Sequence, residues 1–143
     1  MKRITFLALG ILCSMCFSVA QNEQWMAGLN DNIFIAQMSL PGAHNAATSS
    51  LSSIGKCQNK NLSELWDAGV RVFDLRPTDN GNDCTIYHGS LLSTGVTFRE
   101  ALSTITGKLY ANTSEFAVIL MRKEDGDADT WKTKVSAIVN SIS

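Results

Sequence analysis

Four side chains suited to proton transfer or phosphate binding lie in the middle of the sequence. The only two histidines, His44 and His88, each come at the end of an apolar run. Two imidazoles that face one substrate can act as general base and general acid near neutral pH. Asp74 and Arg76 lie between them, and the planar fork of an arginine can hold a phosphate. This set indicates a phosphoryl-transfer site that needs no metal ion.

A plainer interpretation competes at each of these positions. A single histidine at a strand end is more often a satisfied structural residue than a catalytic one. Asp74 and Arg76 are two residues apart and point to the same side of a strand, so they could form a simple ion pair. Spacing and composition alone therefore indicate a candidate phosphate site and leave its chemistry open.

Four apolar runs predict the strands that would position these side chains. The predicted strands cover residues 33–40, 70–75, 84–88 and 116–121. Ionisable groups follow or end each run in turn: His44, then Asp74 and Arg76, then His88, then Arg122 with Lys123 and Glu124. In a β/α barrel the chemistry gathers at the carboxyl ends of the strands, and this arrangement fits that rule.

Helical patterns separate the runs. Helices are predicted over residues 61–68, 97–110 and 127–142, with a short turn at 25–29 and a long loop at 45–60. Asn61 and Thr97 are candidate N-caps, and Glu100 stands at the third helical position after Thr97. Helices that alternate with apolar strands predict a parallel sheet covered by helices.

The first 20 residues have the pattern of a secretory signal peptide. Lys2 and Arg3 precede an uncharged apolar run, and residues 18–20, Ser-Val-Ala, form a small-x-small cleavage site. The run is short for a membrane span, which needs about 20 apolar residues, although an uncleaved anchor is the alternative. We therefore expect a secreted or periplasmic domain over 21–143 with no stable transmembrane segment. Its mildly negative charge argues against nucleic acid as a partner.

Two cysteines, Cys57 and Cys84, remain after the signal peptide. An exported chain with two cysteines favours a disulfide between them. The bridge would close a loop of about 27 residues, which contributes roughly 3–4 kcal/mol in the chain-entropy model. Two separate thiols are the alternative.

Four sequence motifs, in order, resemble those of the phosphatidylinositol-specific phospholipase C X-domain family. They are MSLPGAHN at 38–45, GVRVFDLRP at 69–77, IYHG at 86–89 and the apolar run with its basic and glutamate residues at 115–124. Each motif alone is weak, but four in the right order are specific. The resemblance implies a β/α barrel of the TIM type, of which this chain holds the first four of eight strand–helix units. Arg76 stands where the calcium-dependent branch has an acidic residue, which implies the bacterial, metal-independent type without a cofactor.

The resemblance also implies roles for individual residues. His44 would take the proton from the inositol 2-hydroxyl, and His88 would protonate the departing diacylglycerol oxygen. Arg76 would stabilise the charge on the pentacoordinate phosphorus, with Asp74 positioning it and the attacking hydroxyl. Arg122 lies where the family often has an inositol-contacting lysine. Asn45 departs from the family's usual aspartate, which assists the acid histidine.

The expected activity is cleavage of phosphatidylinositol, or a glycosylated relative, to diacylglycerol and inositol 1,2-cyclic phosphate at a membrane surface. The alternative is a truncated, inactive fragment or a phosphoinositol-binding module that keeps the motif. A glycerophosphodiesterase barrel is a third candidate, but it needs a metal and an acidic ligand set that this sequence lacks.

Overall fold

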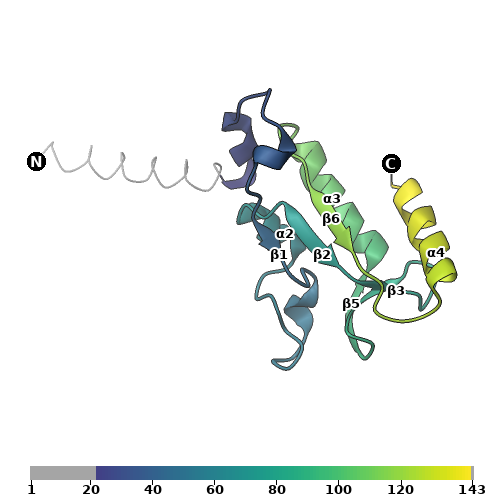
Figure 1. Ribbon diagram of the computed structural model, residues 1–143. Coiled ribbons are helices and arrows are strands. Elements are labelled where there is room, and N and C mark those ends of the chain that lie inside the picture. Colours follow the sequence, from purple (N-terminus) through teal and green to yellow (C-terminus); the bar gives the residue numbers. More distant parts are fainter. Residues whose placement is uncertain (1–21, 143) are drawn as a thin grey trace, which may run out of the picture.

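The computed structural model describes residues 22–142, which form a mixed α/β fold (Figure 1). The predicted signal peptide, residues 1–20, lies outside these residues. A parallel sheet has the order β1–β2–β6, formed by Gly42–Ala43, Val72–Leu75 and Val118–Met121. An antiparallel sheet has the order β3–β4–β5, formed by Pro77–Thr78, Thr85–His88 and Leu92–Thr97.

Within residues 22–142, three α-helices and three short 3₁₀-helices accompany the sheets. The α-helices are α2 (Leu62–Asp67), α3 (Phe98–Ala111) and α4 (Ala128–Asn140). The 3₁₀-helices are η1 (Trp25–Gly28), η2 (Ile35–Gln37) and η3 (Thr48–Ser50). No helix among the described residues combines the length and hydrophobicity needed to cross a bilayer.

Two of the helices begin where their capping residues predict. The Asn61 side chain accepts a hydrogen bond from the backbone N–H of Glu64 at 3.0 Å, and Glu64 accepts one from the backbone of Asn61 at 2.8 Å. Thr97 and Glu100 make the same reciprocal pair at 3.1 and 2.9 Å. Each pair satisfies backbone donors that a helix N-terminus leaves free, which confirms the predicted starts of α2 and α3.

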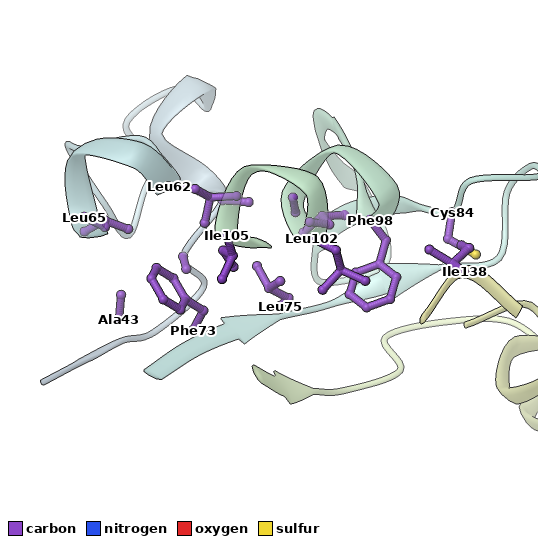
Figure 2. Close-up of a cluster of buried hydrophobic side chains, with 14 of the residues drawn as sticks. Ala43, Leu62, Leu65, Phe73, Leu75, Cys84, Phe98, Leu102, Ile105 and Ile138 are labelled. Carbon is purple, nitrogen blue, oxygen red and sulfur yellow. The ribbon is translucent and has the colours of Figure 1, made fainter. Parts of the chain in front are cut away.

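The main hydrophobic core lies between helix α3 and one face of the parallel sheet (Figure 2). Phe73 and Leu75 on β2 are fully buried against Phe98 and Ile105 of α3. Successive side chains of a strand point to opposite faces, so Asp74 points away from this core. Packing of the two apolar neighbours therefore sets the direction of the carboxylate between them.

The strand predicted over residues 33–40 is wrong. Residues in this run form η2, and Phe34 and Ile35 are exposed. The Gln37 side chain accepts a hydrogen bond from the backbone of Phe34 at 3.1 Å and closes one local turn. The chain enters the sheet only at Pro41, whose carbonyl accepts hydrogen bonds from Arg71 and Val72 at 2.9 and 3.1 Å. Strand β1 is therefore the short segment directly before His44.

The strand predicted over residues 84–88 exists, but it belongs to a different sheet. Gly89, with a φ of 64°, turns the chain back, so that β5 pairs antiparallel to β4. Strand β5 was not predicted. The described residues therefore hold three parallel strands, where the sequence predicted four successive strand–helix units.

The predicted disulfide is also wrong, because Cys57 and Cys84 are both free thiols. Cys84 is buried at the opposite end of the core from Ala43 (Figure 2). Cys57 is exposed in the loop beside Asn45, two residues beyond Ala43. The core thus separates the two thiols. Burial raises the pKa of the Cys84 thiol, which keeps it protonated at neutral pH.

Candidate active site

The carboxyl ends of the neighbouring strands β1 and β2 bring a histidine and a carboxylate together. His44 follows β1, and its Nδ1 lies 2.9 Å from Oδ2 of Asp74 on β2. The His44 side chain is 64% exposed, whereas that of Asp74 is 17% exposed. The imidazole is therefore open to a ligand on one side and anchored on the other.

Asp74 is the centre of a hydrogen-bonded network. Arg76 donates to it from Nη2 at 3.1 Å and from Nε at 3.3 Å, and the backbone N–H of Asn45 donates at 3.1 Å. Burial acts to raise the pKa of the Asp74 carboxyl. The hydrogen bonds from Arg76 and Asn45 and the nearby positive charge outweigh burial, so the pKa falls below its ordinary value of 3.8. Asp74 is therefore an anion at neutral pH.

Arg76 is held between two carboxylates. Besides Asp74, its Nη1 donates to Glu124, which follows strand β6. The hydrogen bond to Asp74 raises the pKa of the guanidinium further, with a contribution from Glu124, so its charge is permanent. Its Nη2 also lies 3.5 Å from Nδ1 of His44. A fixed cation beside an open imidazole is suited to hold a phosphate.

Glu124 is the residue whose contribution the sequence analysis missed. It was placed among the polar residues that follow the fourth apolar run, but it received no role. Its position after a strand parallel to β2 was a usable signal, because the carboxyl ends of neighbouring parallel strands meet at one edge.

The Asn45 side chain contacts Nε2, the second ring nitrogen of His44. Its Nδ2 lies 3.1 Å from His44 Nε2 and 3.6 Å from Cys57 Sγ. If Nδ1 of His44 donates to Asp74, its Nε2 carries the free lone pair, which accepts from the Asn45 amide. Asn45 has a φ of 47°, a left-handed conformation that asparagine adopts more readily than most residues.

Two predicted site residues lie outside this network. His88 Nδ1 is 2.8 Å from the carbonyl oxygen of Gly55, and no hydrogen bond or ion pair within residues 22–142 joins His88 to His44, Asp74 or Arg76. The side chain of Arg122 is exposed, and its backbone N–H donates to Leu75 at 3.2 Å. The structure thus brings together His44, Asn45, Asp74 and Arg76, and leaves His88 and Arg122 apart from them.

A shallow hollow of about 260 Å³ lies on the Asp74 face of the parallel sheet. It is lined by Gly42, Ala43, His44, Val72, Asp74 and Leu120. Because His44 and Asp74 both line the hollow, it can admit a substrate to the histidine. Within residues 22–142, no group of three or more histidine, cysteine or acidic side chains is arranged to hold a metal ion.

Residues 36–142 match the family described as phosphatidylinositol-specific phospholipase C, X domain. The chain belongs to this family. Two relatives named 1-phosphatidylinositol phosphodiesterase, from Listeria monocytogenes and Staphylococcus aureus, are each 27% identical to it. These matches cover 82% and 78% of this chain, but the chain spans only 38% and 37% of the length of those relatives.

Solved structures of the family have the same fold. The phosphatidylinositol-specific phospholipase C of L. monocytogenes aligns with a TM-score of 0.74 and 24% identity, over 84% of this chain and 45% of that one. A phosphatidylinositol-specific phospholipase C of S. aureus aligns with a TM-score of 0.69 and 25% identity, over 76% and 38% of the two chains. The agreement extends over most of the described residues.

Proposed function

We propose that this protein is an exported phosphatidylinositol-specific phospholipase C-like enzyme of the metal-independent type. It cleaves phosphatidylinositol, or a glycosylated relative, to diacylglycerol and inositol 1,2-cyclic phosphate. The observation that carries the proposal is the environment of His44. The imidazole is anchored to Asp74 at 2.9 Å, and the permanent cation of Arg76 lies 3.5 Å away. A base next to a phosphate-binding cation is what this reaction requires.

In the first half of the reaction His44 acts as the general base. The inositol 2-hydroxyl replaces the Asn45 amide at Nε2 of His44, which lies 3.1 Å from it in the free protein. Nε2 then takes the proton from that hydroxyl, and the oxygen attacks the phosphorus to form the cyclic diester. Asp74 stabilises the imidazolium that results, as a carboxylate does when it holds the opposite ring nitrogen. The tethered hydroxyl needs no second molecule for attack, which accounts for the cyclic product.

The leaving group departs as the bond between phosphorus and the diacylglycerol oxygen breaks. His88 supplies the proton to that oxygen. Arg76 stabilises the negative charge that builds on the pentacoordinate phosphorus, and Asp74 with Glu124 holds the guanidinium in place for this task. Arg122 directly follows strand β6, the neighbour of β2, and contacts the inositol ring.

The wider setting follows from the same proposal. The parallel strands β1, β2 and β6 support a β/α barrel, with His44, Arg76 and Glu124 at the carboxyl ends of its strands. Residues 1–20 direct export as a signal peptide, and the domain over 21–143 then meets its lipid at a membrane surface outside the cytoplasm.

A second candidate function is a phosphoinositol-binding module without turnover. The position of His88 favours it, because this histidine bonds to Gly55 and does not join the His44 network. A protein that lacked a placed acid could still hold a phosphate on Arg76.

The test is product analysis in the absence of free metal ions. The purified protein is incubated with phosphatidylinositol vesicles in excess EDTA, and ³¹P NMR follows inositol 1,2-cyclic phosphate. The enzyme hypothesis expects the cyclic product and losses of roughly 10²–10⁴-fold in both His44→Ala and His88→Ala. Headgroup binding with no product would favour the binding module. Turnover that needs calcium, or that survives loss of both histidines, would refute the proposed mechanism.

A further inference from the structure

The loop that follows β1 carries a cysteine between the two histidines. Cys57 is exposed, and its Sγ lies 3.6 Å from Nδ2 of Asn45, the amide that contacts Nε2 of His44. On its other side the thiol donates to the carbonyl of Gly55 at 3.9 Å, and the same carbonyl lies 2.8 Å from Nδ1 of His88. A chain of contacts through Asn45, Cys57 and Gly55 therefore connects two histidines that share no hydrogen bond within residues 22–142.

A buried hydroxyl holds the backbone on both sides of the contact between amide and thiol. Thr48 is 1% exposed, and its Oγ1 donates to the carbonyl of Asn45 at 2.8 Å and accepts from the backbone N–H of Cys57 at 3.0 Å. The backbone N–H of Thr48 donates to the same carbonyl at 3.2 Å. Asn45 and Cys57 are 12 residues apart in the sequence, and one hydroxyl keeps them together. The contact is therefore built into the fold of the loop, although the thiol itself is exposed.

The Asn45 amide depends on Cys57 for its orientation. Asn45 is 3% exposed, and its Oδ1 has no hydrogen-bond partner among the described residues. The Nδ2 end is the one that is held, by Nε2 of His44 and by Sγ of Cys57. Because the thiol hydrogen is directed to Gly55, a lone pair of the sulfur faces the amide and selects its N–H end. The amide oxygen would repel that lone pair, so the thiol opposes a rotated amide.

The orientation of the amide decides whether His44 can act as a base. An N–H of Asn45 at Nε2 leaves that nitrogen as an acceptor, while Nδ1 donates to Asp74. A rotated amide would present its oxygen to Nε2 and favour a proton there, and the ring would then be an imidazolium without a lone pair. The charged groups that face the ring are Asp74 and Arg76, both from the end of β2, and within residues 22–142 neither forms a hydrogen bond with the side-chain amide.

We propose that Cys57 is a positioning residue for the general base. Its sulfur keeps the N–H end of the Asn45 amide toward His44 in the free protein, so that Nε2 retains its lone pair until the substrate arrives. The sulfur also remains a partner for the amide once the inositol 2-hydroxyl has taken its place, so that substrate binding does not leave a buried amide without any hydrogen bond. The inference rests on the proposed function, because it assigns His44 the role of base.

An NMR titration of the histidine rings tests the positioning without any turnover. The chain has only two histidines, so long-range ¹H–¹⁵N spectra report the tautomer and protonation of each ring, and His88→Ala assigns the signals. Neutral His44 should carry its proton on Nδ1 in the wild type. Cys57→Ala removes the sulfur, and the midpoint of the His44 titration should rise by about 0.5–1 pH unit, because the rotated amide favours the protonated ring. The His88 midpoint should stay within about 0.2 unit, since its contact with Gly55 remains.

Two further variants show whether the sulfur acts through the amide. Ser53→Ala removes an exposed hydroxyl from the same loop and should leave both midpoints unchanged. Asn45→Gly removes the amide and suits the left-handed backbone at this position. In that background Cys57→Ala should no longer move the His44 midpoint, because the two residues act as one unit.

The pH dependence of catalysis adds a readout that a purely structural role would not move. In Cys57→Ala the acid limb of kcat/KM, which reports the free protein, should move up with the NMR midpoint. The acid limb of kcat should stay in place, because bound substrate has already displaced the amide. The positioning is overturned if His44 titrates alike in wild type and Cys57→Ala, if Ser53→Ala shifts it as far, or if the shift persists in the Asn45→Gly background. A shifted midpoint in a protein whose wild type forms no cyclic phosphate would count against the proposed function alone.

Discussion

Two arginine–glutamate pairs bracket the same two neighbouring strands, and they differ in what surrounds them. Arg71 directly precedes β2 and pairs with Glu115, which precedes β6. Arg76 directly follows β2 and pairs with Glu124, which follows β6. The same two residue types therefore stand at both ends of the parallel sheet.

The pair at the amino ends is sealed. Both side chains are 0% exposed. The five N–H donors of Arg71 have five acceptors, which are the Glu115 carboxylate and the carbonyls of Trp66, Val70, Asn22 and Glu23. Its guanidinium also lies 3.8 Å from the centre of the Trp66 ring. Arg71 has no donor to spare for a ligand, so its contribution is to stability.

The pair at the carboxyl ends is less completely buried and is called here the open end. The Arg76 and Glu124 side chains are each 12% exposed, and Arg76 Nη2 lies 3.5 Å from Nδ1 of the exposed His44 ring. The two pairs therefore share their residue types and differ in how deeply they are buried and in what lies beside them.

The largest expected effect is on stability at the sealed end. Arg71→Met leaves the Glu115 carboxylate buried without its cation, which should lower the free energy of unfolding by about 3–5 kcal/mol. Arg76→Met is the matched variant at the open end and should cost about 1–2 kcal/mol, because water can partly solvate the groups left behind. Urea denaturation monitored by circular dichroism measures both. Equal losses in the two variants would remove the distinction between the ends.

The next effect is on catalysis at the open end. Arg76→Lys keeps the charge but cannot contact Asp74, Glu124 and a phosphate with one ammonium group, so kcat should fall about 100-fold or more. The free energy of unfolding should change by less than about 1 kcal/mol. The cyclic phosphate assay in EDTA and a parallel urea titration give the two values. A variant that keeps full turnover would show that the fork of Arg76 does not bind the phosphate.

Asn45→Asp sharpens the account of the open end. A carboxylate next to His44 Nε2 adds to that of Asp74 on Nδ1, and the second anion favours the protonated imidazole. The acid limb of the pH–rate profile should therefore move up by about one pH unit. An unchanged limb would mean that the Asn45 side chain does not govern the base histidine. Asparagine and aspartate both tolerate the left-handed backbone, so the exchange adds little strain at this position.

Local patterns predicted the elements that local chemistry decides. Capping residues predicted the starts of α2 and α3, as the pair of Thr97 and Glu100 shows for α3. The apolar run at 116–121 predicted strand β6. The pairing of strands was less accessible, because it depends on distant residues. Strand β5 carries Ser, Thr and Gly95, so its sequence gives little strand signal, and only its partner β4 makes it a strand.

The candidate site shows the same division. Motif positions predicted His44, Asp74 and Arg76, whose contacts follow from the ends of adjacent strands. Two other contacts depend on the conformation of loops, which residue spacing does not predict. They are the contact of His88 with the Gly55 carbonyl and the ion pair of Arg76 with Glu124. The disulfide prediction was wrong for a similar reason, since the export pattern says nothing of the core that separates Cys57 from Cys84.

The smallest expected effect is a dependence of stability on pH that comes from Asp74. Its pKa lies below the ordinary value in the folded chain, so the unfolded chain binds a proton more readily. The stabilisation is therefore complete above the unfolded pKa and is lost as the pH falls through the folded pKa. The carboxylates of Glu100 and Asp127 add slopes of the same sign, because backbone N–H groups of Thr97 and Thr130 lower their pKa values.

Urea titrations between about pH 6 and pH 3 on wild type and Asp74→Asn isolate the contribution of Asp74, since the other carboxylates cancel in the difference. The gap between the two proteins should narrow toward low pH. If the difference in the free energy of unfolding between the two proteins stays constant with pH, the charge of the Asp74 carboxylate does not stabilise the fold. The network around Arg76 would then add no charge-dependent stability at the open end.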